Sequence, residues 1–492
     1  MTERSAVERD LLEQVPDGLF LGGRWTAAGE GGTFAVYDPS SGDELKSIAD
    51  AGPDDAVAAL DAAVAAQADW GRTPPRQRGE LLRRAFDTVT ARAEEFALLM
   101  TMEMGKPLAE SRGEVAYAAE FLRWFSEEAV RIVGRYGVNP EGTGRTIVSQ
   151  MPVGPSYLIT PWNFPLAMAT RKIAPALAAG CTVVVKPASL TPLSTLLFVK
   201  VLEEVGLPAG VVNVLTTTRS SAVTKPLLGD SRLRKLSFTG STAVGQSLMK
   251  QAADGMLRTS MELGGNAPFL IFEDADLDKA VEGAMAAKFR NIGQACTAAN
   301  RFLVHESVAD EFERRVTERT AAMPVGRGTE DGVKIGPLID EDAVEKAVEL
   351  VTDAVERGAR VLTGGSAIDG PGTYYQPTVV TDVRPGSKIL EEEIFGPVLS
   401  ITRFSSEDEA IRLANSTEYG LVGYVYTRDL ARGQRLMERL ETGMMGLNVG
   451  VISNASAPFG GIKMSGIGRE GGFEGIHEYL SPKYTMTPDP FA

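Results

Sequence analysis

The chain has 492 residues, which is too long for a single hydrophobic core and predicts two or three domains. Apolar residues make up 43% and charged residues 23%, as in ordinary globular proteins, and no apolar run approaches the length of a membrane span. With 50 Lys and Arg against 65 Asp and Glu, the formal net charge is −15, which argues against a protein that coats nucleic acid and means that an anionic ligand needs locally placed arginines.

The cysteine content points to the compartment. Two cysteines in so long a chain are typical of an intracellular protein rather than of a secreted disulfide framework. The N-terminal stretch MTERSAVERDLLEQVPDG is too charged for a signal peptide, so we expect a cytoplasmic protein. Two Cys and two His, far apart in sequence, offer none of the usual ligand spacings, and we expect no metal site.

The first half of the chain begins with helices and continues with alternating strands and helices. Residues 54–133 have mostly helical periodicity. The strand-like runs that follow are residues 156–160, 181–187, 210–216 and 233–240, and helical sequence lies at 166–180 and 193–206. Buried apolar strands that alternate with helices predict a doubly wound parallel sheet.

A second alternation starts near residue 266. Its predicted helices are residues 277–291, 308–323 and 430–441, and its predicted strands are 301–305, 378–383, 396–404, 421–427 and 444–450. This pattern indicates a second α/β domain. The strand-like runs 145–153 and 477–487 lie outside both alternations, and we expect them to pair with each other or with another subunit.

Cys296 stands in GQACTAANR, directly after a predicted helix. A cysteine in Ala- and Gly-rich sequence is often only a small buried hydrophobe. The other reading is a nucleophile, which needs a route to the thiolate.

Two further segments sit where open α/β sheets bind ligands. In LSFTGSTAVGQSLMKQ a strand leads through Gly240 and Gly245 into a helix, and such a turn either admits a phosphate or is a plain connection. Lys186 closes the apolar run VVVK at the carboxyl end of a strand, and it is either a ligand-binding residue or a solvated lysine.

Two polar residues have the surroundings of catalytic groups. Glu262 stands before two glycines in ELGGNAP, which implies close backbone packing, although a surface glutamate is the ordinary reading. In PWNFP two prolines stiffen the turn around Asn163. A fixed amide NH₂ is a good donor to an oxyanion, and the alternative is an Asn that bonds its own turn.

Together these motifs resemble the aldehyde dehydrogenase superfamily over essentially the whole chain. The matching stretches, in order, are PWNFP, KPAS, FTGSTAVG, ELGGNAP, GQACTAANR, EEIFGPV and PFGGIKMSGIGREGG. The resemblance implies an α/β fold with a doubly wound parallel-sheet cofactor domain, an α/β catalytic domain and a small β bridging element for oligomerisation. The corresponding boundaries are residues 1–132 and 152–262, residues 263–470, and residues 133–151 and 471–492.

The resemblance also implies catalytic roles. Cys296 looks like the nucleophile that attacks the aldehyde, with its thiol partly ionised by the site and by the positive nicotinamide ring. Asn163 and the backbone N–H of Cys296 would hold the oxyanion. Glu262 would be the general base for hydrolysis of the thioester.

For the cofactor, the resemblance implies NADP or NAD. The residues that would bind it are Thr160, Pro161, Trp162, Lys186, Ser189, Gly240, Ser241, Gly245, Leu263, Glu393 and Phe395. Many NAD-using relatives carry Glu at the position of Ser189, where a carboxylate would repel a 2′-phosphate. Serine can donate to that phosphate, so we expect NADP to be preferred.

Within the superfamily the chain is similar to succinate-semialdehyde dehydrogenases. Arg171, Arg290 and Ser453 match the residues that hold the distal carboxylate there, and Phe164 and Phe459 would line the aldehyde tunnel. The partner is therefore expected to be a small aldehyde with a distal carboxylate. Family members form homodimers or homotetramers, and nothing points to nucleic acid or a membrane.

Other activities remain open at this point. The substrate could be glutarate semialdehyde or another aldehyde, and a non-catalytic binding protein on the same fold is the alternative of a different class. The CoA-acylating reaction is disfavoured because Glu262 is present for hydrolysis. Some members carry a second Cys two residues after the nucleophile, but here that position is Ala298, so no reversible disulfide is expected.

Overall fold

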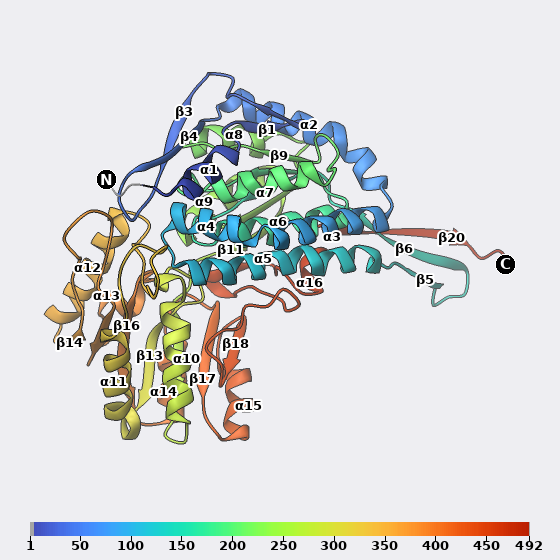
Figure 1. The fold of residues 1–492 in the computed structure, drawn as a ribbon. Helices are drawn as coiled ribbons and strands as arrows, with labels where there is room; N and C mark the ends of the chain where they lie inside the picture. The colour runs from blue at the N-terminus through green and yellow to red at the C-terminus, as the bar shows by residue number, and fades with distance from the viewer. Residues whose placement is uncertain (1–3, 492) are drawn as a thin grey trace.

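The computed structural model describes residues 4–491. Two sheet-centred α/β bodies lie one above the other in Figure 1, and a narrow β arm projects from them with the C-terminus at its tip. The predicted fold class is confirmed.

The first sheet has eight strands in the order β19-β11-β10-β7-β8-β9-β1-β2. Their bounds are β1 Leu19–Leu21, β2 Arg24–Thr26, β7 Ser156–Ile159, β8 Val183–Lys186, β9 Val212–Val214, β10 Lys235–Thr239, β11 Arg258–Glu262 and β19 Gly466–Ile467. The inner strands β11, β10, β7, β8 and β9 are parallel, whereas β1, β2 and β19 add antiparallel edges.

Strand register gathers the predicted functional residues at one edge of this sheet. Ile159 pairs with Lys186, and Thr239 pairs with Glu262, so these four residues end neighbouring parallel strands together. The carboxyl ends of parallel strands form the ligand-binding edge of open α/β sheets. The strand β11, which carries Glu262 in its last position, was not predicted from the sequence.

The second sheet has seven strands in the order β14-β15-β16-β13-β12-β17-β18. Their bounds are β12 Ala267–Ile271, β13 Ala299–His305, β14 Arg360–Thr363, β15 Thr378–Thr381, β16 Val398–Phe404, β17 Val422–Tyr426 and β18 Met444–Leu447. All neighbours are parallel except β14 and β15. The strand β13 begins three residues after Cys296, which fixes the position of that loop.

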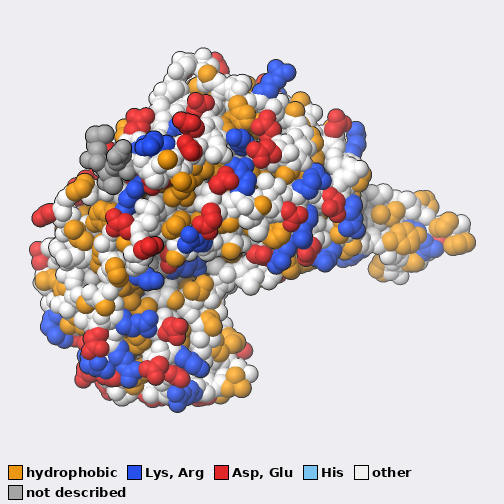
Figure 2. Space-filling model, in the orientation of Figure 1, with side chains coloured by type: hydrophobic (Ala, Val, Ile, Leu, Met, Phe, Trp, Pro, Cys, Tyr) orange, Lys and Arg blue, Asp and Glu red, His pale blue; other side chains and the backbone are white. Residues whose placement is uncertain are grey.

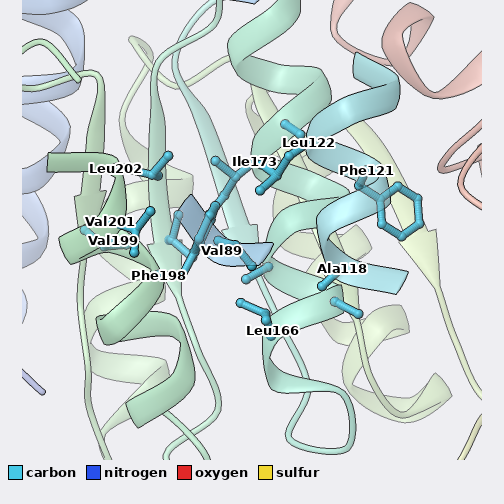
Figure 3. Packing of buried hydrophobic residues seen from close by; sticks show 14 of the residues in the cluster. Val89, Ala118, Phe121, Leu122, Leu166, Ile173, Phe198, Val199, Val201 and Leu202 are labelled. Carbon is cyan, nitrogen blue, oxygen red and sulfur yellow. The ribbon is translucent and has the colours of Figure 1, made fainter. Parts of the chain in front are cut away.

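Helices cover both sheets. They are α1 Ala6–Gln14, α2 Pro53–Arg72, α3 Pro75–Ala91, α4 Ala93–Met104, α5 Leu108–Glu128, α6 Pro165–Ala179, α7 Leu193–Glu204, α8 Ser220–Gly229, α9 Thr242–Asp254, α10 Leu277–Phe289, α11 Glu306–Ala321, α12 Glu341–Glu356, α13 Lys388–Glu391, α14 Glu407–Ala414, α15 Leu430–Arg439 and α16 Glu474–His477. Figure 3 shows the packing of α3, α5, α6 and α7 through side chains such as Leu122, Ile173 and Phe198, all fully buried. Helix α6 is therefore held rigidly where it carries Arg171 and Lys172.

The arm is a three-stranded antiparallel sheet of β5 Arg135–Val138, β6 Gly144–Pro152 and β20 Leu480–Pro488. The two strand-like runs that lay outside the alternations thus pair with each other, with Tyr484 opposite Val148. A separate hairpin pairs β3 Thr33–Tyr37 with β4 Glu44–Ala49. Residues 466–467, inside the predicted catalytic segment, join the first sheet as β19, and the domain boundaries stay predictions.

No helix within residues 4–491 is both long enough and apolar enough to cross a membrane.

Candidate active site

A cavity of about 440 Å³ lies where the carboxyl edge of the first sheet meets the loops of the second. Of the residues predicted from the sequence, it brings together Pro161, Trp162, Asn163, Phe164, Arg171, Gly240, Ser241, Glu262, Leu263, Arg290, Cys296, Glu393, Phe395, Ser453 and Phe459. Residues more than 290 positions apart therefore line one site.

The loop that presents Cys296 has an unusual backbone. After α10 the chain passes through Asn291 and Ile292, whose φ angles of 56° and 62° lie in the left-handed region. Such strain persists only where the surroundings hold it. The Asn291 side chain donates to the carbonyls of Gln294 at 2.8 Å and Asn163 at 3.0 Å, so the Cys296 loop and the PWNFP loop are joined.

Glycines allow the two loops to approach the ELGGNAP turn. A Cβ on Gly265 would lie 2.6 Å from the carbonyl oxygen of Cys296, and one on Gly264 would lie 2.8 Å from Glu393 Oε2. Real Cβ atoms do not approach backbone so closely, so only glycine fits at position 265, whereas a Cβ at position 264 would displace the end of the Glu393 side chain. The close packing inferred from the two glycines is thus present, between Cys296 and the predicted cofactor carboxylate.

Asn163 is fixed from several sides. Its Nδ2 donates to the Gln294 carbonyl at 2.9 Å, and its own carbonyl accepts from Lys106 Nζ at 2.8 Å. Lys106 is fully buried and also lies 2.5 Å from Glu114 Oε2. Glu114 Oε1 in turn accepts from the N–H groups that begin α6. An amide NH₂ has two donor hydrogens, so one remains for the cavity.

The Cys296 thiol is neutral in this environment. Burial raises its pKa to about 12, although Arg171 acts in the opposite direction. The expected ionisation by the site together with the nicotinamide ring stays a prediction, because the protein residues alone raise the pKa of the thiol. Ionisation needs a proton acceptor or a cation brought by a ligand.

Glu262 is 3% exposed, and neither of its carboxylate oxygens has a hydrogen-bond partner within the described part of the chain. Burial, together with the charge of Glu470, raises its pKa well above the ordinary value. A buried carboxyl with a raised pKa that lines a cavity has the properties of a general acid–base group.

Some of the predicted cofactor residues line the cavity and others do not. Glu393 accepts from Gly265 N–H at 3.1 Å, and burial raises its pKa to about 7. Phe395 packs edge-on against Trp162 with ring centroids 5.3 Å apart. Together with Gly240, Ser241 and Leu263 they line the cavity. Sequence reasoning missed Lys346, which also lines it and pairs with Glu392 at 2.7 Å.

Four predicted cofactor residues do not line this cavity: Thr160, Lys186, Ser189 and Gly245. Ser189 faces a separate hollow that it shares with Glu103 and residues 370–373. Lys186 is 6% exposed, and its Nζ donates only to the Pro187 carbonyl, at 3.3 Å, among the described residues. Burial lowers the pKa of Lys186 to about 8, which marks an ammonium group without an anionic partner.

At the far end of the cavity, Arg290 and Ser453 are in contact, with Arg290 Nη1 3.3 Å from Ser453 Oγ. The Phe164 ring lies between two cations: the Arg290 guanidinium 5.2 Å from its centroid and Lys106 Nζ at 4.3 Å. Such cation–π contacts fix both the ring and the guanidinium.

Arg171 is placed differently from the sequence expectation of a free carboxylate ligand. It is 1% exposed, its Nε lies 2.5 Å from Glu470 Oε2, and its guanidinium stacks 4.3 Å from the centroid of the Phe459 ring. The ion pair is not an aligned hydrogen bond, and Nη2 has no hydrogen-bond partner in residues 4–491. Arg171 is therefore paired with Glu470 through Nε, whereas its Nη2 has no hydrogen-bond partner among the described residues.

Tyr117 on α5 was not predicted. It lines the cavity, and its shielded hydroxyl has no hydrogen-bond partner among the described residues. Burial raises its pKa, with the neighbouring charges of Arg171 and Arg290 acting against that rise. No local pattern around Tyr117 could have revealed it, because its role depends on a contact with α6.

Comparison with known proteins now gives the class. The sequence pattern of the aldehyde dehydrogenase family matches residues 25–485. The chain is 62% identical over 447 residues to a succinate-semialdehyde dehydrogenase of Paenarthrobacter nicotinovorans, covering 91% of this chain and 99% of that one. It is 47% identical over 465 residues to a glutarate-semialdehyde dehydrogenase of Pseudomonas putida, covering 94% and 96%.

Among solved structures, an NADP-dependent enzyme of E. coli superposes with a TM-score of 0.96 at 47% identity, covering 98% of this chain and 99% of that one. The protein belongs to the aldehyde dehydrogenase family, and the resemblance seen in the motifs is confirmed. It is thus an oxidoreductase that acts on small aldehydes with a nicotinamide cofactor. No cluster of side chains suited to a metal ion occurs in residues 4–491.

Proposed function

We propose that the protein oxidises succinate semialdehyde to succinate, with NADP preferred over NAD. One observation carries the substrate: two arginines, Arg171 and Arg290, line the same cavity as Cys296, together with the hydroxyl-bearing Tyr117 and Ser453. Arg290 Nη1 lies 3.3 Å from Ser453 Oγ. Guanidinium and hydroxyl groups are the donors that suit a carboxylate.

The energetics favour an anionic far end. A carboxylate that enters a largely apolar cavity loses hydration, which costs several kcal/mol if nothing replaces it. Charge-assisted bonds to Arg290 and Arg171 are each worth roughly 1.5–3 kcal/mol and offset that loss. An uncharged aldehyde of equal length gains none of this and covers the arginines with apolar surface.

The protein residues divide the chemistry between them. Cys296 Sγ loses its proton to solvent, attacks the aldehyde carbon and forms a carbon–sulfur bond as the carbonyl π bond opens, while Asn163 Nδ2 and the Cys296 N–H donate to the oxygen that becomes negative. The nicotinamide cofactor supplies the hydride acceptor when it is bound. Loss of hydride from the carbon leaves a thioester on Cys296, and Glu262 accepts a proton from the water that hydrolyses it.

The chain fits a nicotinamide cofactor. Lys186 keeps a buried ammonium group without an anionic partner, which suits the hydroxyls or phosphate of a ribose. Glu393 is held beside Gly264 and Gly265 at the cavity and suits the second ribose. Ser189 supports NADP because it brings no carboxylate next to a 2′-phosphate, and the E. coli structure with a TM-score of 0.96 is of an NADP-dependent enzyme.

Catalytic efficiency with two aldehydes of equal length tests the substrate. We expect kcat/KM for succinate semialdehyde to exceed that for butanal at least about a hundredfold, which requires about 2.7 kcal/mol of differential binding. Arg290→Ala should remove much of that advantage and spare butanal. Equal efficiency of the wild-type protein with both aldehydes would overturn the proposal.

Glutarate semialdehyde is the second candidate, because a glutarate-semialdehyde dehydrogenase is 47% identical. It carries one more methylene between the aldehyde and the carboxylate. Cys296 and Arg290 line the same cavity, and the ratio of kcat/KM for the two semialdehydes decides between the candidates.

We also propose a homodimer or homotetramer in the cytoplasm. The arm supports the first part: Tyr136 is 70% exposed on one of its faces, and Tyr484 is 59% exposed on the other. Figure 2 shows hydrophobic side chains over this projection. A three-stranded sheet that exposes apolar groups on both faces is stabilised when another chain buries them. The location is tested by cell fractionation.

A further inference from the structure

Arg171 lies between two parts of the site. Its Nε is 2.5 Å from Glu470 Oε2, and the same residue lines the cavity. The Phe459 ring, 4.3 Å from the guanidinium carbon, holds the group flat between them. One delocalised charge therefore serves both Glu470 and whatever occupies the far end of the cavity.

Glu470 forms a pair of buried carboxyls with Glu262. Lys172 Nζ lies 2.5 Å from Glu470 Oε1, and Arg171 holds Oε2. Although burial alone would raise it, the charges of Lys172 and Arg171 hold the pKa of Glu470 below its ordinary value. Burial and the charge of Glu470 act in the opposite direction on Glu262 and raise its pKa.

We propose that Arg171 couples the charge at the substrate's far end to the protonation of the Glu262–Glu470 pair. A bound distal carboxylate shares the guanidinium, and the two carboxyls then hold a proton more tightly, whereas a neutral chain leaves them unchanged. Glu470 is a positioning residue in this scheme, since it acts through Arg171 and Glu262. The inference rests on the proposed function, because it needs a substrate with a distal carboxylate.

The other charged and titratable groups around the pair are the same whichever substrate is bound. They are Lys172 on α6, Lys235 on β10, Arg469 in the loop before Glu470, Glu478 and Tyr479 after it, Tyr117 on α5, and Cys296 across the cavity. Ser237 Oγ donates to Glu470 Oε1 at 3.4 Å. The new charge is thus the only one that differs between a carboxylated aldehyde and a neutral one.

The sign and size of the effect follow from Coulomb's law. An extra negative charge next to Arg171 disfavours the ionised form of Glu262 and Glu470. At the separations that one guanidinium spans, and with an effective dielectric constant of about 20, the pKa of the two carboxyls rises by on the order of one pH unit. Hydrolysis of a succinyl thioester should therefore need a higher pH than hydrolysis of a butyryl thioester.

The first experiment measures protons rather than turnover. Succinate and butyrate share the carboxylate near Cys296, and only succinate has a second one at the far end. Each is titrated into the enzyme saturated with oxidised cofactor, by calorimetry in buffers of different ionisation enthalpy. We expect more protons to be taken up with succinate, and we expect the difference to vanish in Glu262→Gln/Glu470→Gln.

Control variants make this result specific. Glu103→Gln removes a different buried carboxyl, whose pKa burial raises to about 7, and should leave the difference intact. Glu470→Gln alone leaves Arg171 and Lys172 without their carboxylate, so Lys172→Met/Glu470→Gln, which removes one charge of each sign, serves as a second variant. Circular dichroism verifies that each variant is folded. Equal proton uptake for the two ligands in the wild-type protein would overturn the coupling.

The second experiment compares acyl-enzyme decay across pH with succinate semialdehyde and with butanal. We expect the midpoint of thioester hydrolysis to lie about one pH unit higher for the succinyl enzyme. If the enzyme prefers succinate semialdehyde but the two midpoints of thioester hydrolysis coincide, the coupling is contradicted and the proposed function is not. Absence of that preference would instead remove the proposed function, and the coupling with it.

Discussion

The same physical cause acts on Cys296 and Glu262. Burial raises the pKa of the Cys296 thiol to about 12 and that of the Glu262 carboxyl well above its ordinary value. Burial disfavours the charged form of each group, and so does a second negative charge in the same cavity. A bound cation would act in the opposite direction on both groups.

The nucleophile gives the simplest prediction at this scale. Cys296→Ser should lower kcat at least roughly a thousandfold, because the hydroxyl cannot replace the thiolate as nucleophile and leaving group. Reduced cofactor is followed by its absorbance, and cofactor binding to the variant is followed by fluorescence. Turnover within tenfold of the wild-type rate would show that another group attacks the aldehyde.

Glu262 predicts a stability effect with a definite direction in pH. A carboxyl whose folded pKa is raised contributes stability at low pH and loses it as the pH rises from about 4.5 through the folded value. Glu262→Gln stays neutral throughout. Its free energy of unfolding relative to wild type should therefore grow by at least about 1.4 kcal/mol between pH ~5 and pH ~9.

Urea unfolding of both proteins at several pH values measures this difference. Glu262→Gln should also show a fast burst of reduced cofactor followed by slow turnover, because attack on the aldehyde survives and hydrolysis does not. A pH-independent difference in stability would mean that Glu262 is already ionised at low pH.

Ser189 carries the prediction on cofactor choice. Ser189→Glu would place a carboxylate near the 2′ position and should shift the ratio of kcat/KM for NADP over NAD at least about tenfold toward NAD, a change of about 1.4 kcal/mol. Ser189 faces the hollow with Glu103 rather than the catalytic cavity, so the succinate semialdehyde preference should stay unchanged. An unmoved ratio would assign cofactor choice to other residues.

At the scale of elements, α4, α5 and α6 together hold the PWNFP loop. The buried Lys106–Glu114 pair ties the end of α4 and the middle of α5 to Asn163 and to the first turn of α6. Acidic groups at a helix N-terminus satisfy its free N–H groups and complement its dipole. The same lysine packs on Phe164, and that ring in turn supports Arg290.

We therefore predict that Lys106→Met/Glu114→Gln lowers kcat/KM for both aldehydes by roughly 10- to 100-fold, with a further loss for succinate semialdehyde. The double variant avoids an unpaired buried charge, which would cost about 3–5 kcal/mol. Arg112→Met is the matched control, since Arg112 and Glu94 form an exposed ion pair between the same two helices. If the double variant lost stability but kept its kinetics, the pair would be structural only.

The sequence predicted more of the residues that line the cavity than of the residues that hold them in place. Cys296, Glu262 and Asn163 lie in short motifs, where local spacing is visible. Lys106 and Tyr117 were missed because their contacts bridge 57 residues or cross between helices, and nothing local marks them. Glu470 lay inside a recognised motif, yet its contact with Arg171 appears only when α6 meets the chain before the arm.

For the whole molecule, the arm is an exposed apolar element that the proposed oligomer would cover. Tyr484 and Met486 lie on one face of β20, 59% and 50% exposed. Tyr484→Lys/Met486→Lys should dissociate the assembly into smaller species in analytical ultracentrifugation and lower the melting temperature. Met256→Lys, at a methionine that is 90% exposed on the body, is the control. An unchanged sedimentation coefficient would show that this face is free in solution.

The protonated state of Cys296 also has a consequence for how the protein ages under oxidative stress. Peroxide reacts with thiolates, so a thiol with a pKa of about 12 is shielded from it. A sulfenic acid formed at Cys296 would find no internal thiol to trap it, because residue 298 is alanine and the one other cysteine, Cys181, is fully buried with its Sγ near the Tyr479 carbonyl. Without bound ligands the raised pKa disfavours the first oxidation, and a sulfenic acid once formed would depend on an external thiol for its reduction.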